Sequence, residues 1–349
     1  MRTIKDTIID RQIFLENERV EYINCTFKAQ INMKDSRCHF TGCTFEGIDA
    51  EALVATDNSI VLLSDTVFRS NGSKDILLSQ IYLESSTLDA VNTTIENSIN
   101  ASGIEASYSS LKLFKSWIKN NAGSAMTLEN CQLSLMEGAI ISNGNTEMEF
   151  SQIISNNSRC TVSDTAVTGG INANGISARN RSVLTLNRVE IAENQLNGLM
   201  LEHQSTAELN SCTIRDNPPS KEEYLQIWIE EASMRAKKTA ITGGFCGIYA
   251  QKGSRVVLSD VDISNNKKGL CIFESSNISM ENCSINNNEN IQMWLEDSML
   301  KARKLTLTGK GRLIHAENMP LLYLDIKGKL PDPDALEIID CRNVSLVAD

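Results

Sequence analysis

The sequence predicts an all-β chain wound into a solenoid of stacked coils, each made of three short parallel strands. The first observation is a repeat near 22 residues, plainest in the segments 247–263, 269–285 and 291–307, whose starts are 22 residues apart. Seven further blocks of 17 residues fit the same template, starting at Ala52, Ser79, Ser102, Gly138, Gly175, Gly198 and Leu225. A repeat of this length along most of a chain is typical of a solenoid.

Two polar positions test this repeat, because they were not used to align the blocks. The eighth residue is Ser in eight of the ten blocks: Ser59, Ser86, Ser109, Ser182, Ser205, Ser254, Ser276 and Ser298. Three residues past the block end, Asn occurs in seven of ten: Asn71, Asn121, Asn157, Asn194, Asn217, Asn266 and Asn288. We expect these Ser and Asn side chains to form columns along the outside of the coils.

The strands are predicted from the alternation of apolar residues inside each block. In the block that starts at Gly269, three short runs alternate, such as Leu270 with Ile272 and Cys283 with Ile285. A period of two over a few residues indicates a strand. The links are rich in Ser, Asn, Asp and Gly, which favour corners. Each strand is therefore expected to pair in parallel with its equivalent one turn away, at about 4.8 Å.

The corner between the second and third strands carries a resemblance to a known repeat. Two residues separate these strands at Ser259-Asp260, Glu281-Asn282 and Arg303-Lys304. This pattern resembles the right-handed parallel β-helix repeat of the pectin-lyase-like superfamily, over roughly residues 20 to 346. The resemblance implies a right-handed parallel β-helix of about 14 rungs.

One domain is expected over residues 1–349, because a solenoid of this kind has no internal boundary. Residues 1–19 are expected as an N-terminal cap, 20–329 as β-helix coils and 330–349 as a C-terminal coil or cap, since uncovered ends would expose strand edges. The intervals from Ser102 to Gly138 and from Gly138 to Gly175 are 36 and 37 residues long. An abbreviated rung is expected in each, near Cys131 and Thr161.

The composition excludes several classes of partner. The chain has 33 basic and 44 acidic residues, a net charge of -11, and 41% apolar residues. An acidic surface disfavours nucleic acid and anionic membranes, which need a clustered positive field. No apolar run approaches the ~20 residues of a membrane span, and the first ten residues carry charges where a secretory signal is apolar. A soluble, cytoplasmic protein is therefore expected.

One external row of residues is the candidate binding site. In five successive blocks the first strand has one outward residue between two inward apolar ones, and Tyr82 takes the same place in an early rung. We call these five residues the outer row: Met200, Trp228, Tyr249, Cys271 and Trp294. Such a row suits a protein partner or a second copy of the chain. Stacking on a glycan, or cover by a loop or the C-terminal tail, are the alternatives.

Carboxylates beside the outer row are the candidate catalytic residues. Glu230, Glu274 and Glu296 lie at the first corner, and Glu274 and Glu296 are expected as neighbours about 5 Å apart, the separation in retaining glycosidases. The resemblance implies polysaccharide lyases or glycoside hydrolases. However, the Gly-His-Gly motif of the superfamily's polygalacturonases is absent around His39, His203 and His315. The sequence favours a non-catalytic scaffold, with a glycan-binding or glycan-cleaving protein as the alternative.

The ten cysteines predict neither a metal site nor a cofactor. Cys25, Cys43, Cys131, Cys212 and Cys283 share one inward strand position, so they are expected as small apolar fillers. Without a secretory signal we expect reduced thiols. No CxxC pair or His/Cys spacing predicts zinc. Two long connections, 69–78 and 215–224, are expected either on the binding face or as ordinary surface insertions.

Overall fold

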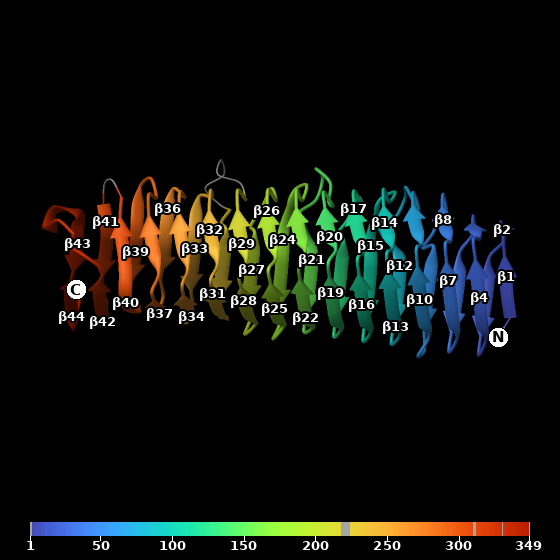
Figure 1. Cartoon of the computed structure of the whole chain (residues 1–349), viewed down its shortest axis with the longest axis horizontal. Coiled ribbons are helices and arrows are strands. Elements are labelled where there is room, and N and C mark those ends of the chain that lie inside the picture. The colour runs from blue at the N-terminus through green and yellow to red at the C-terminus, as the bar shows by residue number, and fades with distance from the viewer. Residues whose placement is uncertain (1, 218–223, 310–311, 330, 349) are drawn as a thin grey trace. The chain divides into compact units, whose positions relative to one another are not determined.

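The computed structural model describes residues 2–217, 224–309, 312–329 and 331–348. Contacts divide the chain into two compact units, residues 1–177 and 178–349, which are described separately. Within each unit the chain runs as a parallel β-solenoid, so the all-β prediction is confirmed. Most turns supply one strand to each of three series, called A, B and C, and strands of successive turns lie side by side (Figure 1).

In the N-terminal unit, series A contains β1 (Arg2–Lys5), β4 (Arg19–Ile23), β7 (Arg37–Thr41), β10 (Ile60–Ser64), β13 (Thr87–Val91), β16 (Ser110–Phe114), β19 (Gln132–Met136) and β22 (Arg159–Ser163). Series B contains β2 (Ile8–Ile9), β5 (Thr26–Phe27), β8 (Thr44–Glu46), β11 (Val67–Arg69), β14 (Thr94–Glu96), β17 (Trp117–Lys119), β20 (Ala139–Ile141) and β23 (Ala166–Thr168). Series C contains β3 (Ile13–Glu16), β6 (Ile31–Lys34), β9 (Leu53–Thr56), β12 (Leu78–Glu84), β15 (Ala101–Ser107), β18 (Met126–Glu129) and β21 (Phe150–Asn156); β24 (Ala173–Arg179) spans the division.

In the C-terminal unit, series A contains β25 (Val183–Asn187), β28 (Thr206–Asn210), β31 (Ser233–Lys237), β34 (Arg255–Ser259), β37 (Asn277–Glu281), β40 (Met299–Thr308), β42 (Leu321–Ile326) and β44 (Val344–Ala348). Series B contains β26 (Glu190–Ala192), β29 (Thr213–Arg215), β32 (Ala240–Thr242), β35 (Asp262–Ser264) and β38 (Ser284–Asn286). Series C contains β27 (Leu199–Glu202), β30 (Ile227–Glu230), β33 (Cys246–Gln251), β36 (Lys268–Ile272), β39 (Ile291–Glu296), β41 (Arg312–Glu317) and β43 (Leu336–Ile339), and a 3-10 turn covers Pro333–Ala335.

The predicted two-residue corners occur where expected. Asp260, Asn282 and Lys304 have φ values of 54°, 52° and 51°, in the left-handed region. A single left-handed residue turns the chain sharply between series A and series B, and Asn or Asp tolerates it best. The same geometry therefore repeats from turn to turn.

The Ser and Asn columns lie inside the turns, so the prediction that they line the outside is wrong. Ser254 and Ser276 are fully buried, and the Ser276 hydroxyl accepts a hydrogen bond from the Ser254 backbone N–H at 3.2 Å. Asn266 is 3% exposed and donates from its side chain to Asn288 Oδ1 at 3.1 Å. Corners leave backbone groups that no strand pairs, and these buried side chains satisfy them.

The block placed at Gly138 is also wrong. The interval before it holds a complete turn with β18, β19 and β20, instead of an abbreviated rung. Asn143, instead of Asn157, occupies the buried Asn column, and its Oδ1 accepts from the Asn121 backbone N–H at 3.1 Å. Asn157 is exposed at another corner, with φ of 47°. Asn suits both corners, which is why the sequence pattern confused them.

The two ends of the chain form strands of the same kind as the rest. Residues 2–16, expected as a cap, supply β1, β2 and β3, which pair with β4, β5 and β6. Near the other end, β43 pairs with β41 and β44 pairs with β42. The expectation of one domain over residues 1–349 stays a prediction.

All ten cysteines are free thiols in the structure, and nine of them are buried. Burial raises the pKa of Cys38 to about 12 and that of Cys43 to about 11. The described part of the chain contains no group of three or more His, Cys, Asp or Glu placed to hold a metal ion. It also contains no helix of the length and hydropathy that a membrane span needs.

Candidate functional site

The outer row lies along series C of the C-terminal unit, in the register that the alternation predicts. Met200 pairs with Trp228, Trp228 with Tyr249, Tyr249 with Cys271 and Cys271 with Trp294. The register continues the row to His315 and then Glu337. These two residues were missed, although His315 stands between the inward residues Ile314 and Ala316 and the alternation could have found it.

The rings near the outer row pack against one another. The ring centroids of Trp228 and Tyr249 are 5.6 Å apart at 35°, and those of Tyr249 and Phe273 are 5.2 Å apart at 38°. Phe273 then meets Trp294 edge to face at 5.7 Å, and Trp294 meets His315 at 5.8 Å. All four aromatic rings are partly buried. Phe273 therefore links Tyr249 to Trp294, and the rings form a continuous tilted stack along the outer row.

Cys271 is the one member of the row that is buried, at 2% exposure, although it was expected to face solvent. Its short side chain lies between the taller Tyr249 and Trp294, and the neighbouring rings cover it. A hollow of about 500 Å³ opens above it, which we call the aromatic hollow. Its lining comprises Leu225, Trp228, Phe245, Cys246, Tyr249, Lys268, Cys271, Phe273 and Trp294.

Sequence reasoning missed five lining residues: Leu225, Phe245, Cys246, Lys268 and Phe273. Phe245 and Phe273 lie just outside the ends of β33 and β36, where alternation gives no direction. Lys268 begins β36, and its Nζ lies 4.8 Å from the Trp294 ring centroid and 5.2 Å from that of Phe245. The indole N–H groups of Trp228 and Trp294 are buried without a hydrogen-bond partner among the described residues.

The Glu230 carboxylate binds neighbouring side chains, and one of them, Gln251, also binds Tyr249. Its carboxylate accepts a hydrogen bond from the Gln251 amide at 2.7 Å and pairs with Lys252 at 2.7 Å. The Tyr249 hydroxyl in turn donates to Gln251 Oε1 at 3.0 Å. The hydrogen bond from Lys252 lowers the pKa of Glu230 below its usual value. Glu230 is therefore a paired carboxylate at the side of the row.

Glu274 and Glu296 are not the neighbours that the sequence predicted. Ile272 pairs with Leu295, so Glu274 falls one residue beyond the position beside Glu296. The register partner of Glu296 is Glu317. Three turns separate Glu230 from Glu296, which is about 14 Å at the backbone. Glu230 and Glu296 are therefore farther apart at the backbone than the about 5 to 9.5 Å of a glycosidase pair, and Glu274 lies diagonal to Glu296, one turn and one residue away.

A second hollow of about 270 Å³ adjoins Trp294 and Lys268. Its other lining residues are Asn290, Ile291, Arg312 and His315. Glu337 accepts a hydrogen bond from His315 Nδ1 at 2.6 Å and pairs with Arg312 at 2.5 Å. The bond from His315 lowers the pKa of Glu337. Arg312 and His315 at this end of the row therefore both contact the Glu337 carboxylate already.

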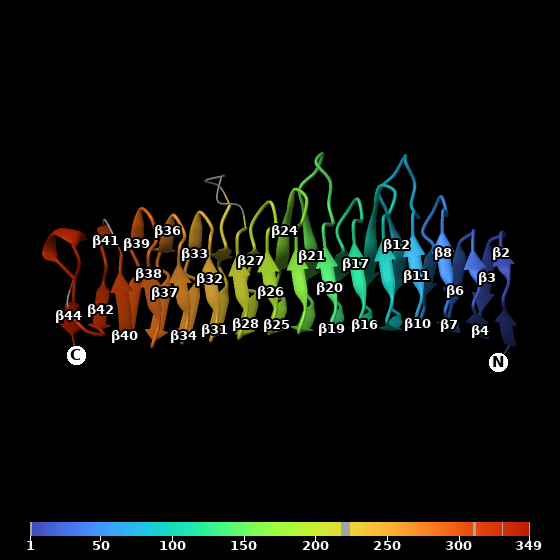
Figure 2. The same ribbon diagram turned by 45° about the horizontal axis from the view of Figure 1, so that its top comes forward.

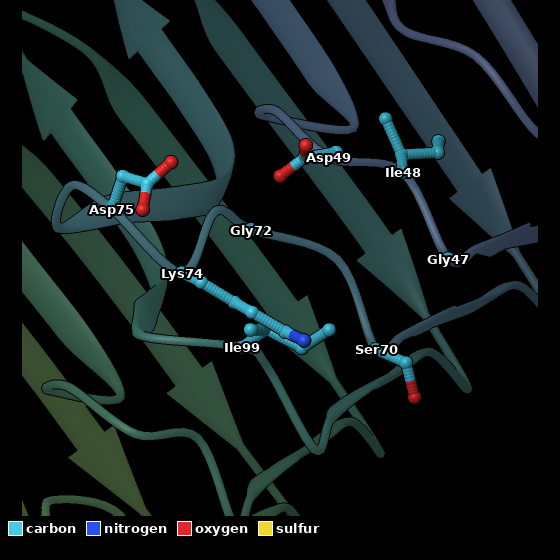
Figure 3. Close-up of a pocket in the computed structure, with 8 residues that line it drawn as sticks. All are labelled: Gly47, Ile48, Asp49, Ser70, Gly72, Lys74, Asp75 and Ile99. Carbon is cyan, nitrogen blue, oxygen red and sulfur yellow. The ribbon is translucent and has the colours of Figure 1, made fainter.

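Tyr82 belongs to the N-terminal unit and has no aromatic partner in its register. It pairs with Val54 on one side and Glu105 on the other. Figure 2 shows two longer loops of this unit, after β11 and after β20. The first is the predicted long connection 69–78, and with residues of two neighbouring connections it lines a hollow of about 360 Å³ (Figure 3). The other long connection, 215–224, lies mostly outside the described residues.

Comparison with known proteins identifies the family. The family model for the right-handed β-helix region matches residues 79–224 and 220–309, more than half of the chain. The chain belongs to this family. Its right-handed parallel β-helix fold is thereby established together with the parallel strand register within each unit. A search of curated proteins found no match.

Solved structures of β-helix proteins are similar over most of the chain but at low identity. The A-module of mannuronan C-5 epimerase AlgE6 from Azotobacter vinelandii is 9% identical with a TM-score of 0.36, covering 95% of this chain and 89% of that one. The AlgE4 A-module is 11% identical, with a TM-score of 0.35 and coverage of 95% and 88%. PfbA, a surface adhesin of Streptococcus pneumoniae, is 10% identical, with a TM-score of 0.30 and coverage of 88% and 84%. Likeness at this level carries no inference about activity.

Proposed function

We propose that this β-helix protein is a non-catalytic scaffold that binds a protein partner through the outer row and the aromatic hollow. The observation that carries the proposal is the hollow itself, about 500 Å³ in volume and lined by apolar side chains with one charge, that of Lys268. Partly exposed apolar surface of this kind is typical of interaction sites. Trp and Tyr also dominate the residues that contribute most to protein interfaces.

The arrangement of the rings favours an apolar side chain over a sugar as the occupant. Stacking on a sugar needs an open flat face, whereas these rings tilt by 35° to 73° and cover one another. Sugar hydroxyls also need hydrogen-bonding partners, and the polar groups at the hollow are few: the Lys268 ammonium, the buried indole N–H groups of Trp228 and Trp294, and the Tyr249 hydroxyl, which already donates to Gln251. Burying unsatisfied hydroxyl groups costs free energy, which an aliphatic or aromatic side chain avoids.

The carboxylates near the row support a non-catalytic role. Glu230 is paired with Lys252, and Glu274 and Glu296 are not register neighbours. An acid and a base of a glycosidase must face one bond across a defined separation. These three side chains are therefore better explained as polar surroundings of a binding row.

The test compares peptide and glycan binding on matched variants. Random heptapeptides displayed on phage are selected on the wild type and on Trp228→Ala, Trp294→Ala and Trp117→Ala, and the same proteins are applied to a glycan array. Trp117 is a control because it is 37% exposed in the other unit. We expect peptides whose binding is lost in the first two variants and kept in the third. Glycan binding lost in the same two variants, with no such peptides, would overturn the proposal.

A second copy of the chain is the protein partner that can be tested without a library. Light scattering across a range of concentrations reports whether the wild type self-associates. Dimers that dissociate in Trp294→Ala, but persist in Trp117→Ala, would identify the partner as another copy. A monomer in all cases restricts the proposal to a different protein.

A further inference from the structure

We infer that the segment bound by the aromatic hollow is acidic as well as apolar. A bulky apolar side chain of the partner enters the hollow, and an adjacent Asp or Glu carboxylate of the partner pairs with Lys268. The inference rests on the proposed function, because it specifies the chemistry of the protein segment that the hollow takes.

Lys268 is placed at the boundary of both hollows. It lines the aromatic hollow and the smaller second hollow, and only Trp294 shares this position with it. The side chain is half-buried, with its Nζ 4.8 Å from the Trp294 ring centroid and 5.2 Å from that of Phe245. Aromatic rings attract a cation but do not neutralise it. An ammonium held in this place therefore still favours an anion.

Two other cations near the row already have carboxylate partners, whereas Lys267, over the Phe245 ring, has none among the described residues. Lys252 pairs with Glu230 at 2.7 Å, and Arg312 pairs with Glu337 at 2.5 Å. Lys268 forms no ion pair within the described ranges of the chain. In a protein with a net charge of -11, a cation left without a partner carboxylate at an apolar site is a specific feature.

The charge of Lys268 determines which partner can cover it. A bound segment excludes water from the two rings and from the ammonium between them. An ammonium that loses water without gaining a counter-charge destabilises the complex, whereas a carboxylate strengthens it because the attraction grows as water leaves. The second hollow, about 270 Å³, gives the segment room to continue past Trp294. A segment with an acidic residue next to an apolar one therefore fills the aromatic hollow and supplies the counter-charge that Lys268 needs.

Two capped tetrapeptides test the inference. One has the order serine, phenylalanine, glutamate, serine, and the other has glutamine in place of glutamate. The protein is labelled with 5-fluorotryptophan, and its three Trp give three fluorine resonances in NMR. Trp228 and Trp294 line the aromatic hollow, and Trp117 in the other unit is the internal control. Titration of each peptide then gives a dissociation constant at the hollow itself.

We expect the glutamate peptide to bind about three- to tenfold more tightly than the glutamine peptide, as for one partly desolvated ion pair. Lys268→Gln should remove this preference, so that the two peptides bind this variant with equal affinity. Lys267→Gln is the matched control, since Lys267 also lies 5.7 Å from the Phe245 ring centroid but does not line the aromatic hollow. The preference should also shrink at high salt.

The outcomes separate the inference from the proposed function. Equal affinities of the two peptides, with shifts at Trp228 and Trp294, would overturn the acidic partner and keep the apolar one. A preference that survives in Lys268→Gln would also overturn it. If neither peptide moves these two resonances and the displayed library yields no ring-dependent peptide, the proposed function fails as well.

Discussion

Aromatic side chains stack along both units, inside the turns of one and outside the turns of the other. In the N-terminal unit Phe27, Phe45 and Phe68 stack face to face, with successive centroids 4.3 Å apart and every ring fully buried. In the C-terminal unit Trp228, Tyr249 and Phe273 follow one another at 5.6 and 5.2 Å and stay partly exposed. The rise per turn sets both spacings. Trp228 and Tyr249 point outward from their strands, and Phe273 lies just beyond the end of β36.

The difference between the two stacks shows how one repeat can produce both a closed core and a surface hollow. An inner stack is enclosed by the rest of its turn, so its rings fill a closed space. The rings of the outer row stay partly exposed, so a short residue at one position leaves a hollow between them. Cys271 between Tyr249 and Trp294 is that short residue. We therefore expect stability to depend on the inner set, and the proposed binding to depend on the outer row.

The largest predicted effect is on stability and should separate the two sets. Phe45→Ala removes a ring that stacks on both sides and should lower the free energy of unfolding by about 4 kcal/mol, through lost burial and a cavity. Trp294→Ala should cost about 1 kcal/mol, because its ring is only partly buried. Urea denaturation followed by circular dichroism measures both. Equal losses would show that the outer row is part of a core.

A substitution of cysteine by leucine at two sites sharpens the same comparison. Cys283 lies in the core at 2% exposure, so Cys283→Leu should cost about 2 kcal/mol by overpacking. Cys271 has the same exposure but lies beneath the hollow, so Cys271→Leu should change stability by about 0.5 kcal/mol or less. Only Cys271→Leu should abolish binding of ring-dependent peptides, because leucine fills the hollow. Equal stability losses would place Cys271 in an enclosed core.

The sequence predicted the outer row because alternation holds within strands. Trp228, Tyr249 and Trp294 each stand between two inward apolar residues, and their register follows from the repeat. Phe245 and Phe273 were not predicted because they lie beyond strand ends. The chain bends there, and side chains no longer alternate between the inner and outer face.

The predicted outside position of the Ser and Asn columns was wrong for a different reason. Ser and Asn were assigned to the surface from their polarity, yet buried backbone groups at the corners require them inside, as at Ser254 and Asn266. The predicted neighbourhood of Glu274 and Glu296 failed because the corner after β36 is one residue longer than the corner after β39. Corner lengths are set by backbone geometry that residue type only weakly specifies.

The next prediction concerns the hydroxyl group of Tyr22, a buried ring of the N-terminal unit. Tyr22 stacks on Phe40 at 5.3 Å and is fully buried, and its hydroxyl has no hydrogen-bond partner among the described residues. Burial raises the pKa of Tyr22 to about 12. Tyr22→Phe removes the unpaired hydroxyl and should raise the free energy of unfolding by about 1 kcal/mol. A loss of stability in urea denaturation would mean that the hydroxyl is satisfied.

The smallest predicted effect concerns two paired carboxylates, one in each unit. Glu46 is bonded by Lys28 and Arg69, and Glu230 by Lys252 and Gln251, and these partners lower both pKa values. A lowered pKa stabilises the fold above the carboxyl's unfolded pKa, near 4.5, and this contribution is lost as pH falls through the folded value.

Glu46→Gln and Glu230→Gln should therefore each cost about 0.5 kcal/mol at pH 7, measured by urea denaturation, and progressively less as pH falls through the lowered folded pKa values. Only Glu230→Gln should weaken peptide binding at pH 7, because Gln251 links Glu230 to the Tyr249 hydroxyl in the hollow. Glu46 has no such link to a ring of the outer row. Equal effects of the two variants on binding would mean that the Tyr249 contact does not position the hollow, and that its rings are held by packing alone.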